Sequence, residues 1–341
     1  MKRTRPLGIL LPTFVALVAA WAVYKGSSAR RLGTPMRADT SCHADPSTVA
    51  DMGHLAPGAV PIACEPWDIG TGVTGYAWRA PNARATLLLQ HGWGDYAQRY
   101  VRQNARLIPH LLGMGVSVYA FDMWGNGRSP GTRGLVDVRQ AVDDHLAARR
   151  KLREQPETRS LPVFLFGHSL GAFVTATSVL RDQRDVSGAI LLAPALDDFG
   201  PLLRGVGRAG AFLVPTLEVP TGGADISVQT RLPEAQGRLT RDTLVMLAGL
   251  PWPTAGGLAA VSHENWARYR GLRVPVLVVH GAADRVAAPT KSRDFIQLVA
   301  SPDKTLHLVQ GGVHAPLDDL GQEDTRRVIL TWLEGRLPPM R

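Results

Sequence analysis

A serine between two glycines is the first feature of this 341-residue sequence that has the chemistry of a nucleophile. Residues 167–171 read Gly-His-Ser-Leu-Gly and fit the pattern Gly-x-Ser-x-Gly, with Ser169 at the centre. A strand-like run precedes the motif at 161–166, and a helix-like run follows it at 172–180. Glycines on both sides permit the tight strand-to-helix turn that lifts a serine hydroxyl out of a sheet. Since a free serine is a weak nucleophile, this interpretation requires a base nearby.

His314 is the histidine best placed to be that base. It ends the sequence Gly-Gly-Val-His at 311–314, directly after the strand-like run 305–309. An imidazole accepts a serine proton near neutral pH and returns it to the leaving group, so activity is expected to fall as the pH drops through ~6–7. Other histidines beside motifs or in helix-like segments are expected to be structural: His91, His110, His145 and His168.

Asp284 is the expected partner of this histidine. It lies in the sequence His-Gly-Ala-Ala-Asp-Arg at 280–285, after the apolar run 274–279. An acid just past a strand end can hold the second histidine nitrogen and stabilise the imidazolium. The chain order Ser169, Asp284, His314 is that of the α/β-hydrolase fold. Two other aspartates, Asp318 and Asp319, are expected to be solvated. Asp122 is expected to fix its own loop by hydrogen bonding.

Acyl transfer also needs two N–H donors aimed at the oxyanion that forms during attack. Leu170, the residue after the nucleophile, is expected to supply one of them. The second is expected from the loop 90–95, which reads Gln-His-Gly-Trp-Gly-Asp and follows the apolar run 86–90. Within that loop the N–H of Trp93 is the expected donor.

These residues need a scaffold that brings distant segments together. Short apolar runs alternate with helix-like segments, which is typical of an α/β fold with a mostly parallel sheet covered on both faces. Buried strands are expected at 86–90, 116–121, 163–166, 189–192, 274–279 and 305–309. Helices are expected at 100–112, 136–155 and 323–336, and an antiparallel edge strand at 71–79.

Residues 197–270 interrupt the alternation. The segment follows the fourth buried run, precedes the fifth and is rich in glycine and proline. A stretch of this length between two core strands is expected to be an inserted cap, because structureless loops of this size are uncommon in compact domains. Four apolar residues within it are expected to share one helix: Leu244, Val245, Leu247 and Leu250. The hydrolase domain with this insertion is expected to span 65–341.

The N-terminus carries most of the excess charge. The formal net charge is +9, but residues 1–31 hold six basic residues and no acidic one. The rest of the chain therefore carries only about +3, so no nucleic-acid partner is expected. A basic start followed by uncharged residues at 7–24 predicts a signal peptide or an uncleaved membrane anchor, with the globular domain outside the cytoplasm (periplasmic in a bacterium). Residues 32–64 are expected to form a linker. Cys42 and Cys64 either pair, as an oxidising compartment favours, or remain thiols.

Several segments resemble the α/β-hydrolase branch of the monoacylglycerol lipases and lysophospholipases, which is grouped with the serine aminopeptidases. They are 91–94 (His-Gly-Trp-Gly) with Arg99-Tyr100, 121–129 (Phe-Asp-Met-Trp-Gly-Asn-Gly-Arg-Ser), 131–134, 167–171 and 280–286. The resemblance covers about residues 65–338. It departs from the family at 122–127, where Asp-Met-Trp-Gly-Asn-Gly stands in place of the usual Asp-x-Arg-Gly-His-Gly.

The resemblance implies a serine hydrolase that cleaves carboxylic esters with a monoacylglycerol- or lysophospholipid-like substrate, reaching the membrane through the N-terminal segment. A peptidase or an acyltransferase with the same triad stays open, as does an inactive binding scaffold. No cofactor or metal is expected. Residues 125–127 lack the third glycine of a dinucleotide-binding loop, and no pair of histidines or carboxylates has metal-ligand spacing. The sequence does not indicate an oligomeric state.

Overall fold

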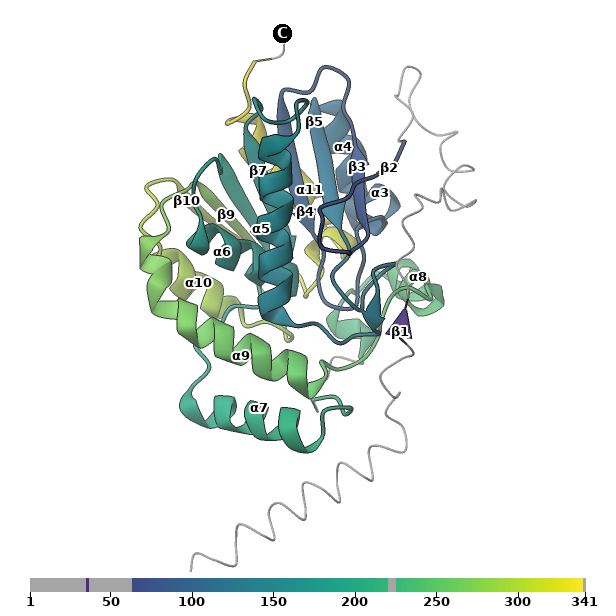
Figure 1. Ribbon diagram of the computed structural model, residues 1–341, viewed down its shortest axis with the longest axis vertical. Helices are drawn as coiled ribbons and strands as arrows, with labels where there is room; N and C mark the ends of the chain where they lie inside the picture. The colour runs from purple at the N-terminus through teal and green to yellow at the C-terminus, as the bar shows by residue number, and fades with distance from the viewer. Residues whose placement is uncertain (1–34, 37–62, 220–224, 340–341) are drawn as a thin grey trace, which may run out of the picture.

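The computed structural model describes residues 35–36, 63–219 and 225–339, and its centre is an eight-stranded sheet (Figure 1). The strand order is β10-β9-β8-β7-β4-β5-β3-β2. Neighbours from β10 to β5 are parallel, whereas β3 and β2 are antiparallel to their neighbours. The bounds are β2 Glu65–Pro66, β3 Gly75–Trp78, β4 Ala85–Gln90, β5 Val116–Phe121, β7 Val163–His168, β8 Gly188–Leu192, β9 Val276–Gly281 and β10 Lys304–Val309. The mostly parallel sheet of an α/β-hydrolase is thereby confirmed.

The central strands are buried on both faces, which explains their continuous apolar sequence. All six residues of β4 are buried. Leu88 belongs to the core on one face, and its neighbours Leu87 and Leu89 belong to the core on the other. Successive side chains of a strand point to opposite faces, so a strand between two helical layers needs apolar residues at every position.

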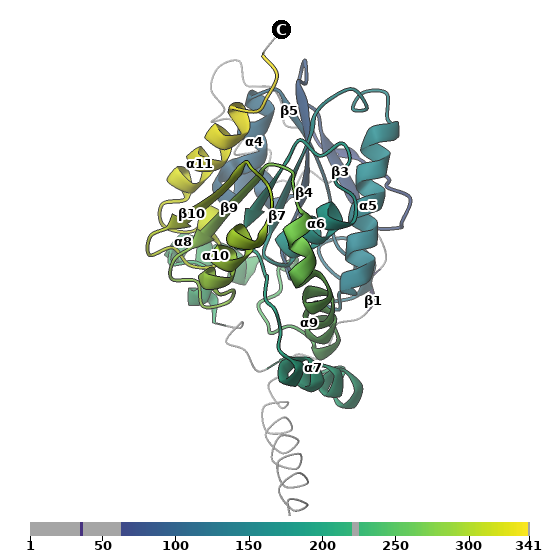
Figure 2. The same cartoon turned by 90° about the vertical axis from the view of Figure 1, so that its left-hand side faces the viewer.

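Helices cover the two faces separately (Figure 2). On one face lie α5 (Val138–Glu154), α6 (Leu170–Arg181) and α10 (Pro289–Leu298). On the other lie α3 (Arg99–Arg102), α4 (Leu107–Gly113) and α11 (Gln322–Glu334). The predicted helices 136–155 and 323–336 are confirmed within one or two residues.

The predicted single helix at 100–112 is wrong. It is broken by the 3-10 turn η3 (Asn104–Arg106), in which all three residues have φ of 52–53°. Arg326 of α11 donates to the Ala105 carbonyl oxygen at 2.6 Å, so a tertiary contact stabilises the break. The apolar residues keep a helical spacing because both pieces face the same core.

Two further expectations about the sheet need correction. Strand β3 is antiparallel as predicted, but it is not the edge, because β2 pairs with it on the outside. Two residues of the expected linker also form structure: β1 (Pro35–Met36) pairs with β6 (Gly131–Thr132). Cys64 is disulfide-bonded, and Cys42 lies outside the described residues.

The N-terminal signal or anchor at 1–31 also lies outside the described residues. Within the residues that are described, no helix combines the length and the apolar character needed to cross a membrane.

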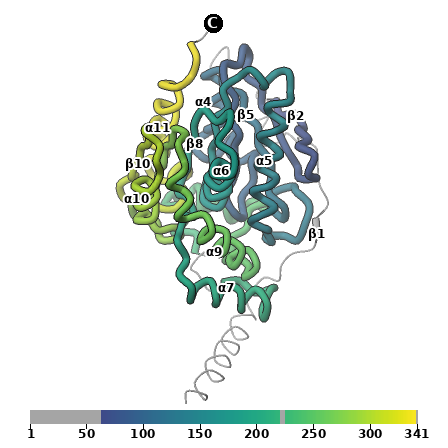
Figure 3. The backbone as a smooth tube through the Cα atoms, turned by 60° about the vertical axis from the view of Figure 1, so that its left-hand side comes forward, coloured from purple at the N-terminus to yellow at the C-terminus, as the bar shows by residue number. Residues whose placement is uncertain are grey.

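The segment between β8 and β9 is called the insertion below. Its described residues include the α-helices α7 (Pro201–Leu213), α8 (Pro233–Arg241) and α9 (Trp252–Trp266) (Figure 1), and α7 and α9 lie together at one end of the sheet (Figure 3). Helices α7 and α9 cross closely, since a Cβ on Gly207 would lie 3.2 Å from the Gly256 Cα. The expected helix through Leu244 and Leu250 is wrong. Those residues form a loop whose Met246 N–H donates to the Gly94 carbonyl oxygen at 2.8 Å.

Candidate active site

Ser169 occupies a strained turn between β7 and α6. Its φ is 53° and its ψ is −118°, a conformation that non-glycine residues rarely adopt. The turn is tight because glycines flank it: a Cβ on Gly167 would lie 2.5 Å from the Gly171 carbonyl oxygen, and a Cβ on Gly171 would lie 2.2 Å from the His91 carbonyl oxygen. Only glycine fits at these two positions, and the turn leaves the Ser169 side chain half-buried.

The structure brings Ser169, His314 and Asp284 together. The Ser169 hydroxyl lies 2.8 Å from His314 Nε2, and His314 Nδ1 lies 2.8 Å from Asp284 Oδ2. Asp284 follows β9 and His314 follows β10, so the carboxyl ends of parallel strands bring residues 145 and 30 positions apart into contact. A serine, an imidazole and a carboxylate in this chain of hydrogen bonds have the geometry of nucleophile, base and orienting acid.

Asp284 is kept ionised by its surroundings. The N–H groups of Val286 and Ala287 donate to its Oδ1 at 2.7 and 3.0 Å. Burial alone would raise the pKa of this carboxyl, but the charge of His314 and hydrogen bonds from His280 and His314 outweigh burial and hold the pKa well below its usual range. His280 Nε2 lies 3.0 Å from Asp284 Oδ2, and His280 Nδ1 lies 2.7 Å from the Ser292 hydroxyl. The sequence placed His280 beside this acid without giving it a role.

His168 supports the loop that carries the base. Its Nε2–H donates to the His314 carbonyl oxygen at 3.1 Å, in agreement with the structural role predicted for it. Burial is the largest cause that lowers the pKa of His168, to about 4, and the neighbouring His314 lowers it further. The ring is therefore neutral at pH 7 and donates one hydrogen bond.

The two expected oxyanion donors both lie beside Ser169. Leu170 is the first residue of α6, where an N–H has no acceptor within the helix. Trp93 follows Gly92, and a Cβ on Gly92 would lie 3.3 Å from the Ser169 Cβ. The Trp93 indole N–H donates to the Gly134 carbonyl oxygen at 2.8 Å, which holds its side chain aside.

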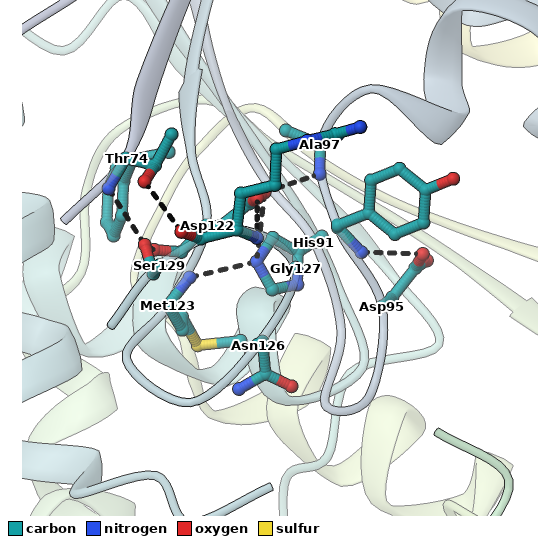
Figure 4. A network of polar contacts seen from close by, with 12 residues as sticks. Thr74, His91, Asp95, Ala97, Asp122, Met123, Asn126, Gly127 and Ser129 are labelled. Atoms are coloured by element: carbon teal, nitrogen blue, oxygen red, sulfur yellow. Dashed lines mark hydrogen bonds and ion pairs between the residues drawn. The ribbon is translucent and has the colours of Figure 1, made fainter. Parts of the chain in front are cut away.

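Asp122 fixes its own loop, as predicted (Figure 4). Its Oδ1 accepts from the Ala97 N–H at 2.8 Å, and its Oδ2 accepts from the Arg128 N–H and the Tyr76 hydroxyl, each at 2.9 Å. Burial raises the pKa of this carboxyl, and these donors act against that rise. Asp122 thus has a buried structural role. The partners of its carboxylate are these two N–H groups and the Tyr76 hydroxyl, and not Ser169, His314 or Asp284.

The expectation that Asp318 and Asp319 are solvated is wrong. Their exposed fractions are 2% and 0%. Asp318 pairs with Arg99 at 3.1 Å and with Arg238 at 3.0 Å, and Asp319 pairs with Arg231 at 2.7 Å. Arg231 and Arg238 come from the insertion, so their partners could not be recognised from local sequence.

Proteins named monoacylglycerol or monoglyceride lipase are similar to this chain over most of its length. The monoacylglycerol lipase of Mycolicibacterium smegmatis is 28% identical over 295 residues, which cover 85% of this chain and 99% of that protein. The human monoglyceride lipase is 31% identical over 241 residues, which cover 68% of this chain and 75% of that protein. The solved structure of the Paleococcus ferrophilus monoacylglycerol lipase matches with a TM-score of 0.67 and 27% identity, covering 77% of this chain and 99% of that one.

The family comparison agrees with these relatives and with the fold. The profile of the family described as serine aminopeptidase, S33, matches residues 81–321, which include Ser169, Asp284 and His314 and both expected oxyanion donors. The chain therefore belongs to the serine aminopeptidase S33 family of α/β-hydrolases, in its monoacylglycerol lipase-like branch, and is a serine ester hydrolase.

Proposed function

We propose that this enzyme hydrolyses acyl esters of monoacylglycerol- or lysophospholipid-like lipids through an acyl-enzyme on Ser169. The contact of Ser169, His314 and Asp284 carries the proposal, because it joins a nucleophile to a base and the base to a carboxylate at 2.8 Å each. The names of the relatives, monoacylglycerol and monoglyceride lipases, support the choice of substrate.

In the first half-reaction the Ser169 oxygen attacks the ester carbonyl while His314 Nε2 takes the hydroxyl proton. Asp284 stabilises the resulting imidazolium, and the N–H groups of Trp93 and Leu170 stabilise the oxyanion. The intermediate then expels the alcohol, which takes the proton from His314. In the second half-reaction water attacks the acyl-enzyme, His314 accepts a proton from the water and returns it to Ser169, and the carboxylic acid leaves.

The insertion supports a lipid substrate. Helix α7 exposes five large apolar side chains: Leu202, Leu203, Val206, Phe212 and Leu213. The exposed fractions of Leu202 and Phe212 are 78% and 85%. Exposed apolar side chains gathered on one short helix are typical of a surface that meets apolar partners. A substrate presented in a micelle or a bilayer fits such a surface.

Hydrolysis of matched substrates tests the proposal. The full chain and Ser169→Ala are assayed on p-nitrophenyl esters of graded acyl length and on monoacylglycerol micelles. The expected result is a maximum at long chains that vanishes in Ser169→Ala. Hydrolysis of short soluble esters alone, with no turnover of micellar monoacylglycerol, would refute the lipid substrate.

Amide hydrolysis or acyl transfer is the second candidate, favoured by the description of the matching family as serine aminopeptidases. Both would use the same three residues. Peptide p-nitroanilides and an added acyl acceptor, assayed beside the esters, separate these reactions. Failure of a fluorophosphonate to label Ser169 would instead indicate an inactive scaffold.

We further propose that the N-terminal segment exports or anchors the domain outside the cytoplasm. The basic start and the uncharged run at 7–24 support this location, as does the disulfide at Cys64, since disulfides persist in oxidising compartments. Protease accessibility in intact cells and spheroplasts tests it. Full protection in both, with digestion only after lysis, would place the domain in the cytoplasm.

A further inference from the structure

The direction of the Trp93 N–H depends on two peptide units. Within the described part of the chain nothing accepts a hydrogen bond from this N–H. The loop that carries it packs against the nucleophile, since a Cβ on Gly92 would lie 3.3 Å from the Ser169 Cβ. The peptide unit before Trp93 contains this N–H, and the unit after it ends at the Gly94 N–H. Whatever holds these two units therefore sets where the Trp93 N–H points.

The unit before Trp93 is held through its carbonyl by His91. The His91 Nδ1–H donates to the Gly92 oxygen at 2.7 Å, and the Met123 N–H donates to His91 Nε2 at 3.0 Å. Because a carbonyl only accepts and a backbone N–H only donates, the two contacts select one tautomer of the ring. In a planar trans peptide the C=O and the following N–H point in opposite directions. Holding the Gly92 oxygen toward His91 therefore turns the Trp93 N–H away from His91.

The unit after Trp93 is held through its N–H by Asn126. The Gly94 N–H donates to Asn126 Oδ1 at 2.8 Å, and Asn126 Nδ2 donates to the Trp124 carbonyl oxygen at 3.1 Å. The second contact orients the amide so that its oxygen faces Gly94. The Asn126 side chain is 1% exposed, so water does not compete for these bonds.

Both contacts depend on the loop 122–129, since Asn126 belongs to it and its Met123 N–H donates to the His91 ring (Figure 4). Asp122 ties the loop to the Ala97 N–H, and the Ser129 hydroxyl donates to the Asp122 carbonyl oxygen at 2.5 Å. A Cβ on Gly127 would lie 2.1 Å from Asp122 Oδ2, so the loop closes tightly around this carboxylate. Within this loop, the Met123 N–H and the Asn126 side chain make the two contacts that connect it to the backbone around Trp93.

We propose that Asn126, together with His91, is a positioning residue that aims the Trp93 N–H at the oxyanion. The proposal rests on the function proposed above, in which Trp93 is an oxyanion donor. It assigns a role to the position where this chain has asparagine and the resembling family usually has histidine. Both side chains are buried, so they act through the backbone of Trp93, and their effect is expected in the stabilisation of developing charge.

Paired p-nitrophenyl esters and thionoesters test this role in the full chain. Sulfur is a weak hydrogen-bond acceptor, so the thionoester gains little from an oxyanion donor. Asn126→Ala and His91→Ala are expected to lower kcat/KM for the ester about 10- to 100-fold and for the thionoester far less. The preference for the ester over the thionoester therefore falls about tenfold. His91→Asn, whose amide can donate near the Nδ1 position, is expected to recover part of it.

Ser129→Ala is the matched control, because it removes the contacts of this loop with the Thr74 N–H and the Asp122 carbonyl oxygen but keeps the Met123 and Asn126 contacts that hold the units beside Trp93. It is expected to lower Tm and to reduce the rates on ester and thionoester in equal proportion. An unchanged ester preference in Asn126→Ala and His91→Ala would overturn the proposal, as would a preference in Ser129→Ala that falls as far as theirs.

The rate of Ser169 labelling by a fluorophosphonate separates this proposal from the proposed function, since the phosphoryl oxygen uses the same donors. If the wild-type chain hydrolyses no ester, the ester function fails. Slower labelling of Asn126→Ala than of Ser129→Ala would then still support the positioning role, and equal rates would overturn it. Absence of labelling in the wild type would overturn both.

Discussion

The two sides of the active site are held by different kinds of contact. The base side comprises the loops after β9 and β10, with Asp284 and His314, and the insertion binds to it directly. The His314 N–H donates to the Val228 carbonyl oxygen at 3.2 Å, and Arg231 pairs with Asp319 at 2.7 Å. The base side is thus secured by charges and by the insertion.

The oxyanion side comprises the loops after β4 and β5, and hydrogen bonds to backbone groups dominate it. His91 and Asn126 hold the backbone around Trp93 through the loop 122–129, and the insertion adds one backbone contact, from the Met246 N–H to the Gly94 carbonyl oxygen at 2.8 Å. Arg99 is the link between the sides, because it pairs with Asp95 at 2.7 Å and with Asp318 at 3.1 Å. The comparison teaches that changes in charge should disturb proton transfer first, whereas changes in backbone packing should disturb oxyanion binding first.

The largest expected effect lies on the base side. Asp284→Asn should lower kcat about 10⁴-fold, because the amide cannot stabilise an imidazolium and favours the wrong tautomer of His314. Steady-state kinetics on the preferred ester measures the loss. The double variant Ser169→Ala/Asp284→Asn should be no slower than Ser169→Ala, since the residues act as a unit. A loss under tenfold in Asp284→Asn would show that this carboxylate does not serve the base.

Acid should weaken the base side through His168. In the folded chain the pKa of His168 is about 4, against ~6.5 for an unfolded histidine. Between these values the unfolded chain binds a proton that the folded chain does not. The free energy of unfolding should therefore fall as the pH drops from ~6.5 to ~4, by about 3 kcal/mol for this group. Urea unfolding at several pH values measures the slope.

His168→Gln supplies the control for that slope, because glutamine does not titrate. The slope should become flatter but should not vanish, since burial also lowers the pKa of His145 well below its usual value. An identical slope in wild type and His168→Gln would contradict the role given to His168.

On the oxyanion side a single added methyl group should be enough to destabilise the fold. Gly171→Ala would place a Cβ 2.2 Å from the His91 carbonyl oxygen, so the β4 end and the α6 start must separate. We expect the free energy of unfolding to fall by about 1–3 kcal/mol. Gly205→Ala is the control, because a Cβ there meets nothing within 4 Å and alanine favours the α7 helix. Equal Tm values for the two variants would contradict the close packing at Gly171.

The smallest expected effects compare a half-buried ion pair with an exposed one. Arg231→Gln removes the cation beside Asp319, whose exposed fraction is 0%, and should cost about 1–3 kcal/mol with a severalfold loss of kcat. Arg327→Gln breaks a pair with Asp324 in which both side chains are about 70% exposed, and should leave Tm and kcat nearly unchanged. Chemical denaturation and kinetics in low and high salt test both. Similar losses of stability and kcat in the two variants would contradict the larger role given to the Arg231–Asp319 pair.

The parts of the molecule predicted from sequence are those set by local pattern. The six parallel strands follow from short apolar runs, and the order of Ser169, Asp284 and His314 follows from motifs that end strands. The contacts that depend on distant partners were not predictable in this way. Asp318 looked like a surface acid because Arg99 lies 219 residues away.

The two wrong helix predictions also result from contacts with residues that are distant in the sequence. The spacing of apolar residues at 100–112 is helical, but the contact from Arg326 favours a break at Ala105. The apolar residues from Leu244 to Leu250 are half-buried in a loop, and the Met246 N–H ties that loop to the Gly94 carbonyl oxygen. Asn126 stood out only as a departure from the family pattern, and the sequence did not indicate its role because its partner Gly94 is 32 residues away and is reached through the backbone.

The backbone at Ser169 leads to a conflict between stability and activity. Its φ of 53° with ψ of −118° is easy for glycine and costly for serine. A selection for thermal stability alone would therefore favour glycine at position 169 and would remove the nucleophile in the same step. The enzyme retains a local conformational cost because the reacting atom must project from that turn, so attempts to make the protein more heat-resistant should leave this turn untouched and modify the molecule elsewhere.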